Sequence, residues 1–285
     1  MTLLRGSWFR SYVPRPSARV RLLCFPYGGG AASAFRGWAE ELPDSVELVA
    51  VQYPGRQDRS GDPSPAGIPE LAEEIVRALG PRFDVPTAFF GHSMGGVVAY
   101  EVARRLRPRF PSPLALLVVS ACRTPADRHH AGLRLADDEM RGYIRSLGGS
   151  GAKALDDEAV WELARPVIRN DLGWTEAYRH VPGAPLTCPI VAVAGDRDPA
   201  ATPQDMELWK NYTIAGADTQ VLPGGHFYFE DGLPRLAGLL AGKLTAADAP
   251  APAAPTSSAP TSSAPTSSAP TSSAPTSSEP TGRRS

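Results

Sequence analysis

The sequence predicts an α/β domain with a mostly parallel central sheet flanked by helices. Short apolar runs recur along the chain, each followed by a glycine-rich turn or a polar break and then by helical apolar spacing. The runs at 114–119 and 190–194 are almost wholly apolar, which is typical of strands covered on both faces.

The predicted strands share this short apolar character. They are residues 20–25, 46–52, 87–90, 114–120, 189–194 and 219–222. The predicted helices instead repeat apolar residues at 3.6-residue spacing. They are residues 35–42, 68–79, 94–106, 204–212 and 233–244.

Residues 123–187 interrupt the alternation because they contain no convincing strand. Helical spacing at 135–147 and 156–178 predicts inserted helices, joined by a flexible link at Gly148-Gly149-Ser150-Gly151. An insertion over the carboxyl edge of a parallel sheet is the usual position of a lid on an active site. The alternative is that these helices only enlarge the core.

Composition divides the chain into a folded domain, residues 1–245, and a tail, residues 246–285. The tail repeats Pro-Thr-Ser-Ser and contains alanine as its only apolar residue type. Such a segment cannot bury a core, so we expect a disordered Pro/Thr/Ser/Ala-rich extension. The remaining length suits one large α/β domain.

Charge and cysteine usage exclude several classes of partner and location. Lys plus Arg total 29 against 30 Asp plus Glu, so no basic field suits nucleic acid. The three cysteines are widely separated, which favours a reducing compartment over a disulfide framework. Neither a signal peptide nor a membrane-spanning run is visible, so we expect a soluble, cytoplasmic protein with no membrane association.

The sharpest motif is Gly91-His92-Ser93-Met94-Gly95, a G-x-S-x-G placed between a predicted strand and a predicted helix. A serine at such a tight turn is exposed above the sheet, and the crowded backbone requires glycine on either side. We interpret Ser93 as a nucleophile rather than as part of a structural turn.

A serine nucleophile needs a general base, and the chain contains five histidines. His92 lies inside the turn itself, His129 and His130 are adjacent and therefore point apart, and His180 follows an insertion helix as a capping or surface residue. His226 lies in the loop after the last predicted strand, from which it can reach a serine above the sheet. No Cys or carboxylate cluster accompanies the histidines, so we expect no metal site.

The carboxylate that orients the base should lie at a strand end between Ser93 and His226. Asp196 and Asp198 both follow the strand at 189–194, and the residues alone leave the choice between them open. Either one gives the chain order Ser, Asp, His, which is that of the α/β-hydrolase fold.

Acyl transfer also needs two N–H donors for the developing oxyanion. One is the backbone N–H of Met94, directly after the nucleophile. The second should come from the glycine-rich loop at 25–31, and we assign it to Gly28. A phosphate-binding loop is the alternative, but neither nucleotide-binding glycine pattern is present.

With these residues in place, the chain resembles the stand-alone type II thioesterases of nonribosomal peptide and polyketide synthases. The resemblance spans about residues 7–243 and rests on five segments. These are Leu23-Cys24-Phe25-Pro26-Tyr27-Gly28-Gly29, Gln52-Tyr53-Pro54-Gly55-Arg56-Gln57-Asp58-Arg59, Gly91-His92-Ser93-Met94-Gly95-Gly96, Gly195-Asp196-Arg197-Asp198-Pro199 and Pro223-Gly224-Gly225-His226-Phe227.

The Pro-Gly-Arg-x-x-Arg segment discriminates most, because generic lipases and peptidases of this fold lack it. By resemblance, the acid of the triad is Asp198. Two features depart from the family: Tyr27 stands where relatives often have His, and the family has no Pro-Thr-Ser-Ser tail.

The resemblance implies hydrolysis of acyl or aminoacyl thioesters held on the phosphopantetheine arm of carrier proteins, clearing misprimed or stalled units without a cofactor. A general carboxylesterase or an acyltransferase of the same fold is one alternative. A catalytically silent protein that only docks a carrier is another, and fold alone cannot choose among them.

Overall fold

The structure is a computed structural model that describes residues 4, 6–106, 114–126 and 135–248. The histidine pair at 129–130 and the tail from 249 onward lie outside the described residues. Expectations about them therefore stay predictions.

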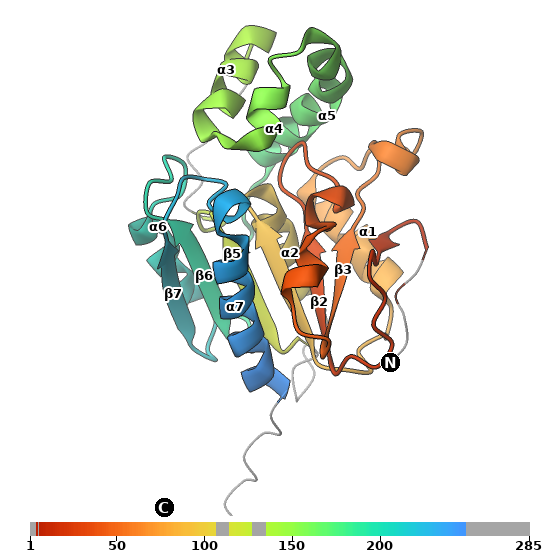
Figure 1. The fold of residues 1–285 in the computed structure, drawn as a ribbon, viewed down its shortest axis with the longest axis vertical. Coiled ribbons are helices and arrows are strands. Elements are labelled where there is room, and N and C mark those ends of the chain that lie inside the picture. The colour runs from red at the N-terminus through yellow and green to blue at the C-terminus, as the bar shows by residue number, and fades with distance from the viewer. Residues whose placement is uncertain (1–3, 5, 107–113, 127–134, 249–285) are drawn as a thin grey trace, which may run out of the picture. The chain divides into compact units, whose positions relative to one another are not determined.

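A sheet of seven strands forms the centre of the described domain (Figure 1). The strand order is β1-β3-β2-β4-β5-β6-β7; β1 pairs antiparallel with β3, and all other pairs are parallel. The strands are β1 (Phe9–Arg10), β2 (Val20–Phe25), β3 (Val46–Val51), β4 (Thr87–His92), β5 (Leu116–Ser120), β6 (Ile190–Gly195) and β7 (Ala217–Leu222). This mostly parallel arrangement confirms the predicted α/β class with its mostly parallel central sheet.

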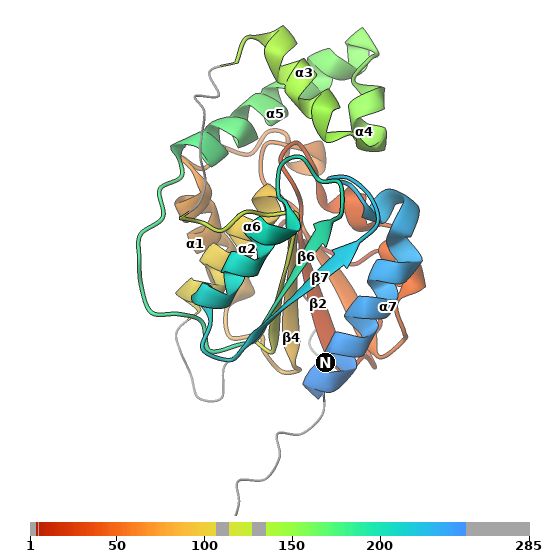
Figure 2. The same cartoon turned by 90° about the vertical axis from the view of Figure 1, so that its left-hand side faces the viewer.

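Helices cover both faces of the sheet (Figure 2). The four that pack on the sheet are α1 (Ile68–Leu79), α2 (Met94–Arg105), α6 (Pro203–Glu207) and α7 (Phe229–Asp248). Leu23 and Phe25 of β2 belong to the apolar cluster under α1 and α2, whereas Leu22 and Cys24 belong to the cluster under α7. This alternation follows from the two-residue period of a strand and explains the continuous apolar runs.

The parallel register brings the loops after several strands to one edge of the sheet. Phe25 pairs with Gly91, and His92 pairs with Ser120, so β2, β4 and β5 end side by side. Gly195 pairs with Leu222 at the ends of β6 and β7. The predicted nucleophile, acid, base and donor loop all follow these strand ends.

The insertion consists of α3 (Asp137–Leu147), α4 (Gly149–Ala154) and α5 (Glu158–Ala177), which lie beyond this edge of the sheet (Figures 1 and 2). The predicted flexible link at 148–151 is wrong. Gly148 adopts a left-handed φ of +78° that ends α3, and α4 begins at the next residue. Glycine here terminates one helix and allows the sharp turn into another.

Other elements also differ from the prediction. The predicted helix at 35–42 is two short 3₁₀ turns, Ala32–Phe35 and Trp38–Glu41, with Gly37 between them. The region at 204–212 is α6 followed by a 3₁₀ turn, Leu208–Tyr212. Strand β1 was not predicted, because two residues are too few to show a period.

Two further observations concern membrane-spanning helices and the cysteines. None of the helices in the described ranges is both long and apolar enough to cross a bilayer. Cys24, Cys122 and Cys188 are buried free thiols.

Candidate active site

Ser93 occupies a strained turn between β4 and α2. Its φ of +54° and ψ of −119° are rare for a residue with a side chain, and its N–H donates to Ser120 O at 2.8 Å. A Cβ built on Gly91 would lie 2.2 Å from Gly95 O, and one built on Gly95 would lie 2.2 Å from Phe25 O. Backbone packed against backbone therefore accounts for both glycines of the motif.

His226 lies beside Asp198 in a buried pair. The imidazole Nδ1 is 2.9 Å from Asp198 Oδ2 and 3.1 Å from Oδ1, and both side chains are at most 3% exposed. The Nε2 atom of His226 has no hydrogen-bond partner among the described residues, and His226 borders the same cavity as Ser93. The imidazole is thus held on one side and left available on the side of the cavity.

Asp196 makes different contacts from Asp198. Its side chain is 48% exposed, accepts a hydrogen bond from Gly224 N–H at 2.8 Å and lies 3.6 Å from Arg197. The carboxylate next to the strand end therefore fixes the loop that carries His226, and the one two residues later contacts the imidazole itself.

The two predicted donors lie together at the cavity. Met94 is the first residue of α2, so its N–H has no acceptor within the helix. A Cβ built on Gly28 would lie 3.9 Å from the Met94 Cβ. In the glycine-rich loop, Gly29 N–H donates to Asp171 and Gly30 N–H to Tyr27 O, whereas Gly28 N–H is not used by any described residue.

A cavity of about 790 Å³ opens beside Ser93 and His226. Much of its wall comes from apolar side chains of the insertion. They are Leu135, Tyr143, Ile144, Leu147, Leu155, Val160, Ala164, Ile168 and Leu172. A cavity of this size and character suits an acyl chain better than a polar metabolite.

His92 packs behind the base rather than taking its place. It is fully buried, its ring centroid lies 4.9 Å from that of His226, and its Nδ1 is 2.9 Å from Ser120 Oγ. Ser120 Oγ is in turn 2.7 Å from the Tyr228 hydroxyl. Burial, and then the neighbouring His226, hold the pKa of His92 well below its usual value, so the ring stays neutral at neutral pH.

His180, the other histidine among the described residues, does not reach the site. His180 is half-buried against Tyr100 and Tyr212, with Nδ1 3.4 Å from Arg104 Nη1. No group of His, Cys, Asp or Glu residues among those described could hold a metal ion.

Sequence reasoning missed one polar contact at the site, a buried ion pair between Arg56 and Asp171. Arg56 belongs to the discriminating Pro-Gly-Arg segment, for which no role was predicted, and Asp171 lies on α5. Asp171 follows Ile168 and precedes Trp174 on the buried face of that helix. A carboxylate at a helical core position is a signal of a buried cationic partner, although it does not say which one.

The chain is similar to proteins of one known family. Residues 20–244 match the family described as Thioesterase domain. Thioesterase PikA5 of Streptomyces venezuelae is 40% identical over 228 residues, covering 79% of this chain and 81% of PikA5.

Two solved structures show the same similarity. The type II thioesterase BorB from the borrelidin biosynthetic cluster has a TM-score of 0.76 at 37% identity, covering 84% of this chain and 98% of BorB. RedJ, a thioesterase of the prodiginine pathway in Streptomyces coelicolor, has a TM-score of 0.73 at 41% identity, covering 81% and 88%.

Proposed function

Because this chain belongs to the thioesterase family and is a type II thioesterase of α/β-hydrolase fold that hydrolyses thioesters, we propose that its substrates are acyl or aminoacyl groups on carrier proteins. The carriers are those of a polyketide or nonribosomal peptide synthase, and the reaction removes misprimed or stalled units. The observation that carries the proposal is the His226–Asp198 pair beside Ser93 at an apolar cavity.

We assign the chemistry to Ser93, His226 and Asp198. Nε2 of His226 accepts the proton of Ser93 Oγ as the oxygen attacks the thioester carbonyl carbon. Asp198 accepts the Nδ1 hydrogen bond, which sets the tautomer and stabilises the imidazolium that forms. The strained turn at Ser93 holds the hydroxyl above the sheet throughout the reaction.

The tetrahedral intermediate places negative charge on the former carbonyl oxygen. The N–H groups of Gly28 and Met94 donate to this oxygen, and the carbon–sulfur bond then breaks. The phosphopantetheine thiolate leaves with the proton from His226, so the acyl group remains on Ser93 as an ester. Water, deprotonated by His226, then attacks that ester; the bond between the acyl carbon and Ser93 Oγ breaks, His226 returns the proton to Oγ, and the carboxylic acid is released.

The partner supplies the phosphopantetheine arm, and the chain's own residues supply all the groups in this scheme. Three free buried thiols fit the cytoplasm, where we place the reaction.

Ser93→Ala tests the function. We expect kcat on an acyl-loaded carrier protein to fall on the order of 10⁵-fold, because the acyl-enzyme cannot form. Ser146→Ala is the matched control: Ser146 also lines the cavity, but its hydroxyl donates to Tyr143 O at 2.7 Å. A fluorophosphonate should label the control and not the Ser93 variant.

Two results contradict the proposal. Retention of most thioesterase activity in Ser93→Ala would remove the serine mechanism. Turnover of free short esters with none on carrier-bound thioesters would instead identify a general carboxylesterase.

A further inference from the structure

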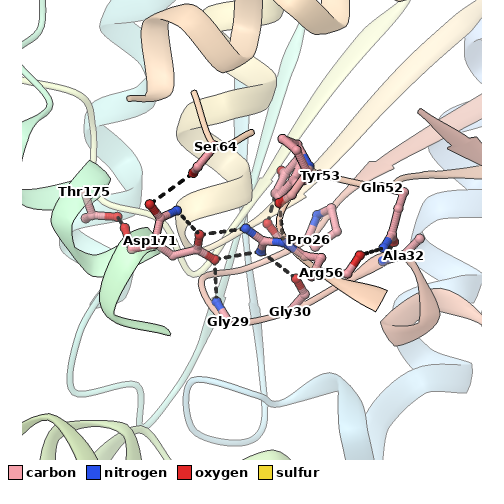
Figure 3. Close-up of polar contacts among 12 residues, drawn as sticks. Pro26, Gly29, Gly30, Ala32, Gln52, Tyr53, Arg56, Ser64, Asp171 and Thr175 are labelled. Atoms are coloured by element: carbon pink, nitrogen blue, oxygen red, sulfur yellow. Dashed lines mark hydrogen bonds and ion pairs between the residues drawn. The ribbon is translucent and has the colours of Figure 1, made fainter. Parts of the chain in front are cut away.

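The arginine of the Pro-Gly-Arg segment is buried at the junction of the sheet and the insertion. Arg56 follows β3, and Asp171 lies on α5, 115 positions later. Their side chains are 4% and 0% exposed and form two parallel hydrogen bonds, Nη1 to Oδ2 at 2.7 Å and Nη2 to Oδ1 at 2.8 Å. Figure 3 shows this pair beside the glycine-rich loop.

Both ions also bind the backbone of that loop. Asp171 Oδ2 accepts from Gly29 N–H at 2.7 Å, and Arg56 Nη1 donates to Gly30 O at 2.9 Å (Figure 3). The bond to Gly29 N–H fixes the plane of the peptide that joins Gly28 to Gly29. That peptide directly follows the N–H that we assign to the oxyanion.

Helix α5 also closes on the loop sterically. Gly29 has a φ of +78°, and a Cβ there would lie 2.9 Å from Ile168 Cγ1. A Cβ on Gly28 would lie 3.7 Å from the Asp171 Cβ. One face of α5 is therefore in contact with two successive glycines of the loop.

The opposite side of Arg56 is held by residues that directly follow β3. Gln52 Nε2 donates to Arg56 O at 3.0 Å, and Gln52 Oε1 accepts from Ala32 N–H at 2.9 Å. The Arg56 guanidinium lies 5.2 Å from the centroid of the Tyr53 ring, and the Tyr53 hydroxyl donates to Pro26 O at 3.2 Å. The network thus holds both ends of the loop, at Pro26 and at Ala32.

A loop with three consecutive glycines has more conformational freedom than a loop of the same length without them. Oxyanion donors contribute most when their direction is fixed before the reaction. Burying two charges is costly unless every polar atom has a partner, and here the hydrogen bonds that satisfy the pair are largely the ones that fix the loop.

We propose that Arg56 and Asp171 are positioning residues, which aim the Gly28 N–H at the oxyanion only while α5 is docked against the loop. The inference rests on the proposed function, since it concerns the same acyl transfer. It assigns a mechanistic role to the Pro-Gly-Arg segment and couples the insertion to the chemistry.

The test compares Asp171→Asn and Arg56→Lys with the control Asp137→Asn. Asp137 of α3 pairs with Arg165 and Arg169 of α5, where all three side chains are partly exposed. Turnover of butyryl-N-acetylcysteamine gives kcat and KM. Inhibition by the matching trifluoromethyl ketone, whose hemiketal oxyanion needs the same donors, gives Ki.

We expect kcat to fall about 10- to 100-fold in both variants while KM changes less than about threefold, since a misdirected donor costs transition-state stabilisation. Ki for the ketone should rise by the same factor as kcat/KM falls. Asp137→Asn should stay within about twofold of the unmodified chain in all three quantities.

A double substitution separates loss of loop positioning from loss of folding. Arg56→Met with Asp171→Leu replaces the buried pair by apolar side chains, a change that proteins often tolerate. We expect this variant to melt near the unmodified chain and still to lose kcat and ketone affinity together. A folded variant with unchanged kcat, or with a loss confined to KM, overturns the proposal.

The proposed function and this inference fail separately. If the unmodified chain hydrolyses no thioester, the function fails, and loop positioning is then measured by hydrogen exchange at residues 28–30. Faster exchange there in the double variant than in Asp137→Asn supports positioning, and equal exchange contradicts it.

Discussion

The carboxyl edge of the sheet and the helical insertion are held together by different means. At the sheet edge, backbone packs directly on backbone, as at Gly91 and Gly95, and little can shift without a clash. The insertion is joined to the domain mainly by side chains. The nucleophile therefore lies on the part that side-chain rearrangement cannot easily alter.

The insertion itself has two unlike halves. The end of α5 is fixed to the domain: Trp174 Nε1 donates to Pro65 O at 2.9 Å, and the Tyr178 hydroxyl donates to Glu101 at 2.6 Å. Burial, and then the bond to Glu101, raise the pKa of Tyr178, so it stays a donor.

Helices α3 and α4 pack on the first part of α5 in a small apolar cluster separate from the main core, which includes Met140, Leu155, Trp161 and Ile168. Among the described residues, Ser150 of α4 donates to Glu230 of α7 from both its N–H and its hydroxyl, which is a local contact with the sheet domain. From this difference we predict that gating motion involves α3 and α4, while the end of α5 stays with the catalytic body.

The largest effect should come from the sheet edge. Asp198→Asn should lower kcat on the order of 10⁴-fold, because the imidazole loses its orienting carboxylate. Asp196→Asn should cost far less, since Asp196 bonds to Gly224 N–H and not to His226. Steady-state kinetics of both variants on one thioester measures the two losses of kcat. A larger loss in Asp196→Asn would reverse the assignment of Asp198 as the acid.

The two halves of the insertion should differ in stability. Trp174→Ala should lower the free energy of unfolding by roughly 3–5 kcal/mol, because it empties a site in the main core. Trp161→Ala should leave the urea midpoint of the sheet nearly unchanged and accelerate hydrogen exchange only at 137–161. Equal protection of α3, α4 and the central strands would contradict a two-part insertion.

Acidification should lower the free energy of unfolding through His92 before it breaks the ion pairs of Asp137 in the insertion. His92 has a folded pKa below its unfolded value near 6.5, so the unfolded chain binds more protons as the pH falls below about 6.5. Stability is then lost on acidification, by up to about 1.4 kcal/mol per pH unit for this one group. The Arg165 and Arg169 side chains hold the pKa of Asp137 below its usual value, so those ion pairs persist.

Urea unfolding at pH 7.5 and 5.5 measures this loss. His92→Gln should flatten the dependence more than His180→Gln, because His180 is only half-buried. Equal slopes in the two variants would rule out His92 as the source.

The smallest effect should come from the Pro-Thr-Ser-Ser tail. A chain ending at Asp248, the last residue of α7, should keep its Tm within about 1 °C and its turnover of thioesters, because the repeat composition cannot pack. A selective loss on carrier-bound substrate, with butyryl-N-acetylcysteamine unaffected, would show instead that the tail docks the synthase.

Features with a local signal could be predicted from the sequence. Each apolar run predicted a strand. The G-x-S-x-G between strand and helix indicated a nucleophile elbow, and the geometry at Ser93 matches one. His226 followed from its place after the last strand. The residues alone did not decide whether Asp196 or Asp198 orients the base. The direction of a carboxylate in a loop depends on hydrogen bonds that the position of a strand end does not reveal.

Features that depend on tertiary contacts could not be predicted. Arg56 and Asp171 are far apart in the chain, and nothing local to either residue names the other. Residues 149–154 contain two glycines that suggest a loop, yet Phe227 and Glu230 pack and bond against the start of α4 and stabilise a helix there. Tertiary packing outweighs intrinsic propensity at such places.

The division between reactive loops and an apolar wall from the insertion has a consequence for protein engineering. Most of the cavity wall can be exchanged by grafting residues 135–178 from a relative, which offers a route to a different acyl-chain length without touching Ser93. The graft must bring an aspartate at position 171 and a side chain like that of Ile168. A chimera without these two side chains would gain a new pocket. On the proposal above, its Gly28 N–H would no longer be directed at the oxyanion.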